Sequence, residues 1–160
     1  MPTKAPTKAS PAAPEFDLET DNGKRVSLDD FAGKWLIVYF YPRDNTPGCT
    51  REANDFTKAL PLLKKLGAEV VGVSKDSVKS HEGFKEKMGI TFRLLSDPEL
   101  EAHKAFGAWG VKNMYGKKVE GTIRSTFLIS PKGELARVWK NVKVNGHVDA
   151  VVAAMREAKA

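Results

Sequence analysis

Apolar residues along the chain gather in short continuous runs that are separated by longer amphipathic stretches. The run WLIVYFY at 35–41 is rich in aromatic and β-branched side chains, which predicts a strand buried on both faces. A second run, EVVGVS at 69–74, and a third, FRLL at 92–95, each follow a helical stretch that ends at a glycine, Gly67 or Gly89. Strands that alternate with helices predict a parallel α/β core.

The two ends of this core carry antiparallel patterns. Asn22-Gly23 lies between the alternating runs EFDLET and KRVSL, and such a pair predicts a β-hairpin. Pro131-Lys132-Gly133 joins STFLIS to ELARVWK and predicts a second hairpin, and residues 147–159 form an amphipathic helix pattern. We therefore expect an α/β protein with a thioredoxin-like fold, in which helices flank a central mixed β-sheet that is preceded by an N-terminal β-hairpin.

The remaining segment, between the third strand and the second hairpin, gives weaker signals. Ser96-Asp97-Pro98 supplies a cap and an initial proline, which predict a helix running to Phe106 and ending at Gly107. The stretch from residue 108 to residue 124 is expected to be irregular.

Length and composition indicate how these elements are organised. At 160 residues, with 41% hydrophobic and 29% charged residues, the chain fits one globular domain at 14–160. Residues 1–13 mix Pro, Ala, Lys, Thr and Ser, so we expect a flexible tail and no secretory signal. No apolar run approaches the ~20 residues that span a bilayer, so no membrane association is expected and the cytoplasm is the predicted location.

Charge and metal-binding residue types exclude other classes of function. The net charge is +6, but lysines alternate with acids, as in EGFKEKMG, so we expect no nucleic-acid partner. One cysteine cannot form an internal disulfide or a thiolate metal site, and no cofactor is expected. His81, His103 and His147 lie far apart in the sequence and are predicted to be surface or capping residues.

The segment YPRDNTPGCTREANDF follows the first buried strand, where active sites of α/β sheets are found. Thr46 suits the N-cap of the next helix and Pro47 its first position, which places Cys49 third. Free N–H groups and the helix dipole there favour the thiolate. The alternative interpretation is that Cys49, like most free cysteines, is a small buried residue that only packs in the core. Ionisation alone increases the rate of nucleophilic attack only slightly, because a less basic thiolate is a weaker nucleophile.

PRDNTPGC resembles the peroxiredoxin active-site signature, which Pro42, Thr46 and the peroxidatic Cys49 match. In that family the threonine hydroxyl and an arginine from a later strand hold the peroxide. TIRSTFLIS resembles the segment that supplies this arginine, here Arg124. The resemblance also implies that Pro42 shields the thiolate and that Glu52 orients Arg124.

The resemblance extends over nearly the whole chain, and GAEVVGVSKDS, LLSDPE and FGAWG are similar to the bacterioferritin-comigratory or PrxQ branch. Many members of that branch carry a resolving cysteine where this chain has Asn54. The resemblance therefore implies a one-cysteine enzyme that reduces hydrogen peroxide or alkyl hydroperoxides through a Cys49 sulfenic acid. An external thiol such as thioredoxin, glutaredoxin or glutathione would recycle it. A monomer is predicted, with a dimer as the alternative. The alternative function is a peroxide sensor or redox-switched binding protein that uses Cys49 without efficient turnover.

Overall fold

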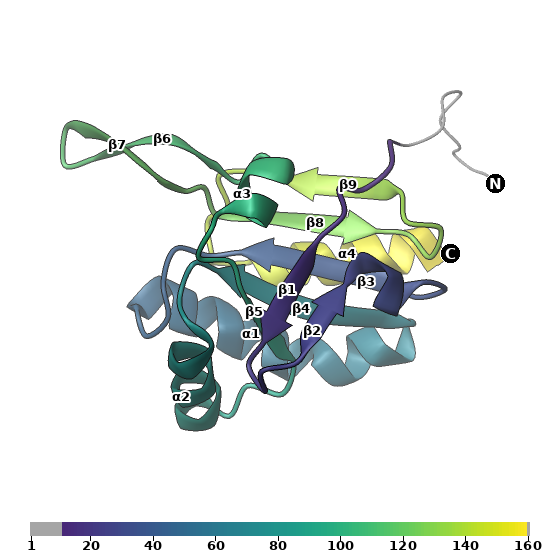
Figure 1. The fold of residues 1–160 in the computed structure, drawn as a ribbon. Helices are drawn as coiled ribbons and strands as arrows, with labels where there is room; N and C mark the ends of the chain where they lie inside the picture. Colours follow the sequence, from purple (N-terminus) through teal and green to yellow (C-terminus); the bar gives the residue numbers. More distant parts are fainter. Residues whose placement is uncertain (1–10, 160) are drawn as a thin grey trace.

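The computed structural model describes residues 11–159, and Figure 1 shows a central sheet flanked by helices. In chain order the elements are β1 (Asp17–Thr20), β2 (Arg25–Ser27), η1 (Leu28–Phe31), β3 (Trp35–Phe40), α1 (Pro47–Lys65), β4 (Ala68–Ser74), α2 (Val78–Met88), β5 (Arg93–Ser96), α3 (Glu101–Ala105), β6 (Trp109–Met114), β7 (Lys117–Thr122), β8 (Ser125–Ile129), β9 (Leu135–Trp139) and α4 (His147–Lys159). Within the described part, no helix is both long and apolar enough to cross a membrane.

The main sheet has the order β2-β1-β5-β4-β3-β8-β9. β3 pairs in parallel with β4, and β4 pairs in parallel with β5, while the outer pairs are antiparallel. The sheet is therefore mixed, as the sequence predicts. Its two parallel pairs place the carboxyl ends of β3, β4 and β5 at one edge, and α1 begins beyond that edge.

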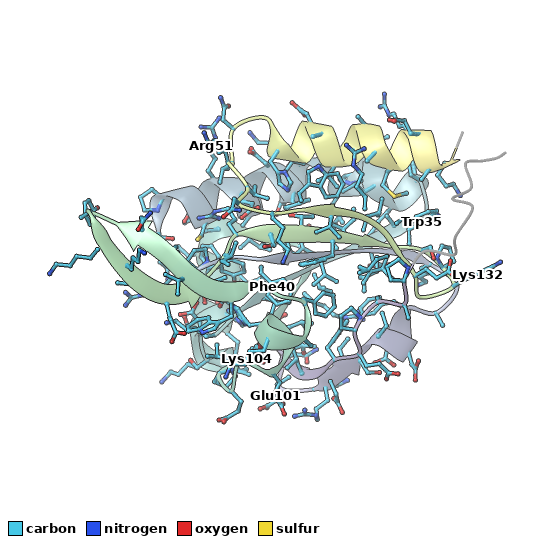
Figure 2. All side chains as sticks on the ribbon, turned by 90° about the horizontal axis from the view of Figure 1, so that it is seen from above. Trp35, Phe40, Arg51, Glu101, Lys104 and Lys132 are labelled. Carbon is cyan, nitrogen blue, oxygen red and sulfur yellow. The ribbon has the colours of Figure 1, made fainter. Side chains whose placement is uncertain are left out.

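Two apolar layers cover the sheet, because the side chains of β3 alternate between its faces. Ile37 and Tyr39 pack with apolar residues of α1, α2 and α4, whereas Leu36, Val38 and Phe40 pack with the N-terminal strands and α3. In Figure 2, Phe40 lies on the side of the sheet that carries α3. These five side chains are almost completely buried, so the strand is buried on both faces as predicted.

The segment predicted to be irregular contains a β-hairpin. β6 and β7 pair antiparallel over six residues each, and the hairpin projects away from the main sheet (Figure 1). Tyr115 and Gly116 at its tip both have positive φ, 53° and 80°, as a two-residue hairpin turn requires. The sequence signal was weak because Tyr-Gly is an uncommon pair for this turn and KKVEG has little strand propensity.

The predicted start of the third helix is also wrong. Ser96 is the last residue of β5, and α3 begins only at Glu101, after Leu100 in a left-handed conformation. Asp97 still serves the helix, because its carboxylate accepts the backbone N–H groups of Ala102 (3.3 Å) and His103 (2.8 Å). Asp97 therefore caps a helix that begins four residues later, after a turn that the local sequence pattern does not predict.

Two further expectations differ from the structure. Residues 11–13 are not free: Ala12 bridges Glu134, and the Ala13 amide donates to the Gly133 carbonyl (2.8 Å). Residues 1–10 lie outside the described residues, so the rest of the flexible tail stays a prediction. The histidines are wrongly predicted to lie at the surface. His81, His103 and His147 are all buried, each with a hydrogen-bonded ring nitrogen.

Candidate active site

The first turn of α1 positions the thiol. Thr46 has the extended backbone of an N-cap (φ −94°, ψ 153°) and Pro47 is the first helical residue, as predicted. Cys49 is therefore third in the helix, and only 1% of it is exposed. It packs in the same apolar cluster as Ala53 and Phe56, one and two turns further along α1.

Arg124 reaches the thiol from the short connection between β7 and β8. Its Nη2 group donates to Cys49 Sγ at 3.4 Å, and its Nη1 group donates to Glu52 Oε1 at 2.6 Å. Glu52 is three residues after Cys49, and its side chain is completely buried, whereas 17% of the Arg124 side chain is exposed. The carboxylate therefore holds the guanidinium against the sulfur while one edge of the guanidinium stays accessible.

Gly48 allows this close approach. A Cβ atom at position 48 would lie 3.3 Å from Arg124 Nη2, which is tighter than an ordinary van der Waals contact. The backbone of residue 48 is helical, so its conformation does not require glycine. Space for the guanidinium is therefore the structural reason for glycine beside Cys49.

Burial sets the electrostatics of the pair. It raises the pKa of Glu52 to about 7, against the lowering effect of Arg124. Burial lowers the pKa of Arg124, but Glu52 and Cys49 outweigh it, and the net pKa lies above its ordinary value. Glu52 Oε2 has no hydrogen-bond partner among the described residues. The site therefore holds a permanent cation beside a carboxyl group that titrates near neutral pH.

Pro42 and Thr46 lie in the loop that joins β3 to α1. The Thr46 hydroxyl donates to the carbonyl of Arg43 at 2.9 Å, so it is not used to cap the helix. Pro42 is half-buried at the start of the same loop. Of the five site residues predicted from the sequence, the structure links Cys49, Glu52 and Arg124 by direct contacts and places the other two before the helix.

A buried network that was not predicted from the sequence holds this loop. The Asp44 carboxylate accepts hydrogen bonds from Tyr41 Oη (2.6 Å) and Ser80 Oγ (2.7 Å) and contacts His81 Nδ1 (2.8 Å). Burial raises the pKa of Asp44, but these three partners together lower it below its ordinary value. No local pattern reveals this network, because His81 is 37 residues away in the sequence.

Among the described residues, Asp44, Asp76 and His81 form the one group of three possible metal ligands, with ligand atoms within 4.8 Å of one another. Hydrogen bonds account for this proximity. The Asp44 amide donates to Asp76 Oδ2 at 2.8 Å, and Ser74 Oγ donates to the same oxygen at 2.7 Å. These hydrogen bonds make the group part of the network that holds the loop before α1.

A depression of about 710 Å³ lies between α1 and α4, away from the thiol. Arg51, Asp55 and Lys58 line it, and their spacing places them on the side of α1 opposite Cys49. Figure 2 labels Arg51 beside the start of α4, where its guanidinium donates to Asn145 Oδ1 at 3.0 Å. This depression is therefore separate from the cysteine site.

Comparisons with known proteins identify the family of this chain. Residues 10–138 match the model of the AhpC/TSA family. Peroxiredoxin Bcp of Xanthomonas campestris pv. campestris is 49% identical over 142 residues, which are 89% of each chain. Peroxiredoxin Bcp of Bacillus subtilis is 43% identical over 145 residues, 91% of this chain and 92% of that protein.

A solved structure of Xanthomonas campestris Peroxiredoxin Q has a TM-score of 0.86 and 48% identity, and the match covers 91% of this chain and 92% of that one. This similarity confirms the predicted thioredoxin-like fold. The family match, the two relatives and the solved structure agree on one classification. The chain belongs to the AhpC/TSA family and is a peroxiredoxin of the Bcp (PrxQ) group.

Proposed function

We propose that Cys49 is the nucleophile of a thiol peroxidase that reduces hydrogen peroxide and organic hydroperoxides and is recycled by an external thiol. The observation that carries this proposal is the contact of Arg124 Nη2 with Cys49 Sγ while Glu52 holds Nη1. A fixed cation beside a thiol is the arrangement that peroxide reduction needs, because negative charge develops on the oxygen that leaves.

The reaction begins with attack of the Cys49 thiolate on one peroxide oxygen. An S–O bond forms, the O–O bond breaks, and the departing oxygen leaves with the electron pair and takes up a proton as water or alcohol. The attacked oxygen keeps its hydrogen, so Cys49 becomes a sulfenic acid, and the proton taken up by the departing oxygen comes from water. Arg124 stabilises the growing charge, and Thr46 supplies a hydroxyl at the start of α1. Pro42 shields the sulfur from the side of the loop.

Organic hydroperoxides are included because of one relative. The Xanthomonas campestris bacterioferritin comigratory protein, 48% identical to this chain, has been solved as trapped intermediate and ligand complexes that bear on its alkyl peroxide reduction activity. In this chain the Arg124 side chain is partly exposed, which leaves the site open to a substituent on the outer oxygen. Alkyl hydroperoxides therefore belong to the proposed substrate class.

Recycling must use a second molecule, because Cys49 is the only cysteine of the chain. A thiol attacks the sulfenic sulfur and releases water to form a mixed disulfide, and a second thiol then releases Cys49. Since Cys49 is 1% exposed, the first turn of α1 has to move before a thiol can reach the sulfur. Thioredoxin, glutaredoxin and glutathione are the candidate reductants, and a cytoplasmic location and a monomeric state stay predictions.

Steady-state peroxide consumption tests this proposal. The protein is supplied in turn with thioredoxin, glutaredoxin and glutathione, each with its reducing system, and Cys49→Ser is the control. We expect continuous consumption with at least one reductant and none by Cys49→Ser. A single oxidation without turnover by any of them would support the alternative, a peroxide sensor, and residual activity of Cys49→Ser above a few per cent would exclude Cys49 as the nucleophile.

A further inference from the structure

Two lysines lie near the active site and belong to none of the ion pairs found in residues 11–159. Lys112 belongs to β6, and its Nζ donates at 2.8 Å to the carbonyl of Thr122, two residues before Arg124. Lys75 follows the end of β4, and its Nζ lies 5.7 Å from the centre of the Trp109 ring. Lys112 therefore lies beside the segment that carries Arg124, and Lys75 lies against a side chain of the same strand, β6.

The side chain of Lys112 is held along the hairpin because residue 121 is glycine. A Cβ atom there would lie 3.0 Å from Lys112 Cε and 3.5 Å from its Nζ. Gly121 and Lys112 project from the same face of the hairpin, since Lys112 pairs with Val119 and alternate residues of a strand share a face. The Thr122 carbonyl takes one of the three ammonium N–H groups, and the other two have no acceptor among the described residues.

Lys112 is held beside the segment that carries Arg124, and it lies within electrostatic range of the candidate active site. Burial lowers the pKa of Lys112, Arg124 and Lys75 lower it further, and Cys49 opposes them, so all three groups lie within electrostatic range. Glu52 already pairs with Arg124. Conversion of the Cys49 thiolate to a neutral sulfenic acid therefore removes the negative charge that raises the pKa of Lys112.

We propose that Lys112, supported by Lys75, binds the negatively charged group of the thiol that reduces oxidised Cys49, so that the reductant is an anionic thiol with a carboxylate near its sulfur. This inference rests on the proposed function. The thiolate attacks the sulfenic sulfur, an S–S bond forms, the S–O bond breaks, and hydroxide leaves and takes a proton to become water. A second thiolate attacks the outer sulfur of the mixed disulfide and releases the Cys49 thiolate.

A series of small thiols that differ in charge tests the inference. Protein oxidised with one equivalent of hydrogen peroxide is mixed with mercaptoacetate, 2-mercaptoethanol or cysteamine, whose second groups are anionic, neutral and cationic. The mixed disulfide is followed by intact mass, and each rate constant is expressed per thiolate and corrected for basicity. We expect mercaptoacetate to react fastest and cysteamine slowest, with adjacent members differing by about three- to ten-fold at low salt.

Three variants test whether the dependence of the rate on thiol charge comes from Lys112. Lys112→Gln keeps a donor for the Thr122 carbonyl but loses the charge, so we expect the differences between the thiols to shrink by at least about three-fold. Lys112→Arg should preserve them. Lys118→Gln removes an exposed charge from the opposite face of the same hairpin and should keep the wild-type pattern.

The outcomes separate this inference from the proposed function. If all three thiols form mixed disulfides at rates that do not depend on charge, or if Lys112→Gln and Lys118→Gln change the pattern equally, the inference is wrong and the peroxidase cycle stands. If no thiol, including the protein reductants, reacts with oxidised Cys49, external recycling is wrong and the inference falls with it.

Discussion

Glu52 and Arg124 form an ion pair beside Cys49, in which the carboxylate is buried and the guanidinium is partly exposed. Their 2.6 Å contact joins residues that are 72 positions apart, and it directs the second guanidinium nitrogen to the sulfur. The carboxylate is completely buried, so it cannot exchange this partner for water. Loss of Glu52 leaves the Arg124 guanidinium without its partner, and loss of Arg124 removes the group that lowers the pKa of Glu52.

Arg124→Ala should slow the oxidation of Cys49 by hydrogen peroxide by about a hundred-fold or more, the scale of losing one preorganised donor at a developing charge. The rate is measured by stopped flow under single-turnover conditions. Arg137→Ala, which removes an exposed arginine of β9, is the control and should react like the wild type. A loss of less than about ten-fold would mean that Arg124 is only a neighbour of the thiol.

Gly48→Ala should raise stability and lower activity. Alanine is the better helix former by about 0.5–1 kcal/mol, but its Cβ would lie 3.3 Å from Arg124 Nη2 and displace the guanidinium. We expect a slower oxidation of Cys49, by about ten-fold, in a protein at least as resistant to urea as the wild type. Gly83→Ala is the matched control, because that helical position has open space and only stability should change. Unchanged oxidation in Gly48→Ala would contradict the packing argument.

Glu52→Gln should change how stability depends on pH. Burial raises the pKa of Glu52 from its ordinary value of 4.5 to about 7, despite Arg124. A raised folded-state pKa contributes stability that is fully present below the unfolded value and is lost as pH rises through the folded value. Relative to the variant, the free energy of unfolding of the wild type should therefore fall between pH 4.5 and pH 7, by on the order of 3 kcal/mol, and then level off.

Urea denaturation at several pH values measures this difference. Glu120→Gln, at an exposed position of β7, serves as the control and should follow the wild-type profile. Parallel profiles of the wild type and Glu52→Gln would show that Glu52 does not titrate in this range.

Excess peroxide should oxidise wild-type Cys49 beyond the sulfenic acid, because Asn54 stands where a resolving cysteine is expected and no other thiol exists in the chain. Intact mass should show the gain of two oxygen atoms of a sulfinic acid, and an excess of external thiol should prevent it. A wild-type protein that resists this oxidation without added thiol would contradict the one-cysteine mechanism.

Asn54→Cys should form an internal disulfide only by unwinding part of α1. Position 54 is five residues after Cys49 in a continuous helix, so the two side chains do not converge as a disulfide requires. Intact mass should show the loss of two hydrogens, and amide exchange should accelerate over residues 49–56. The reduced form of the same variant is the control, and a disulfide without faster exchange would show that the helix accommodates the bond.

Local signals in the sequence determined the strands of the core, the Asn22-Gly23 hairpin and the place of Cys49 in its helix. Each depends on side-chain period, turn chemistry or capping within about ten residues, and the structure keeps all of them. The resemblance added Arg124, Glu52, Thr46 and Pro42, whose roles no local pattern could supply.

Tertiary structure alone decided the contacts that span long distances in the chain. Arg124 meets Cys49 across 75 residues, and Asp44 meets His81 across 37. The β6–β7 hairpin is local, but its sequence has too little strand propensity to predict it. The histidines are buried for the same reason, since a polar ring is tolerated inside when distant partners satisfy its nitrogens. The packing of the whole chain determines which groups become these hydrogen-bond partners. The local hydrophobic pattern therefore cannot predict them.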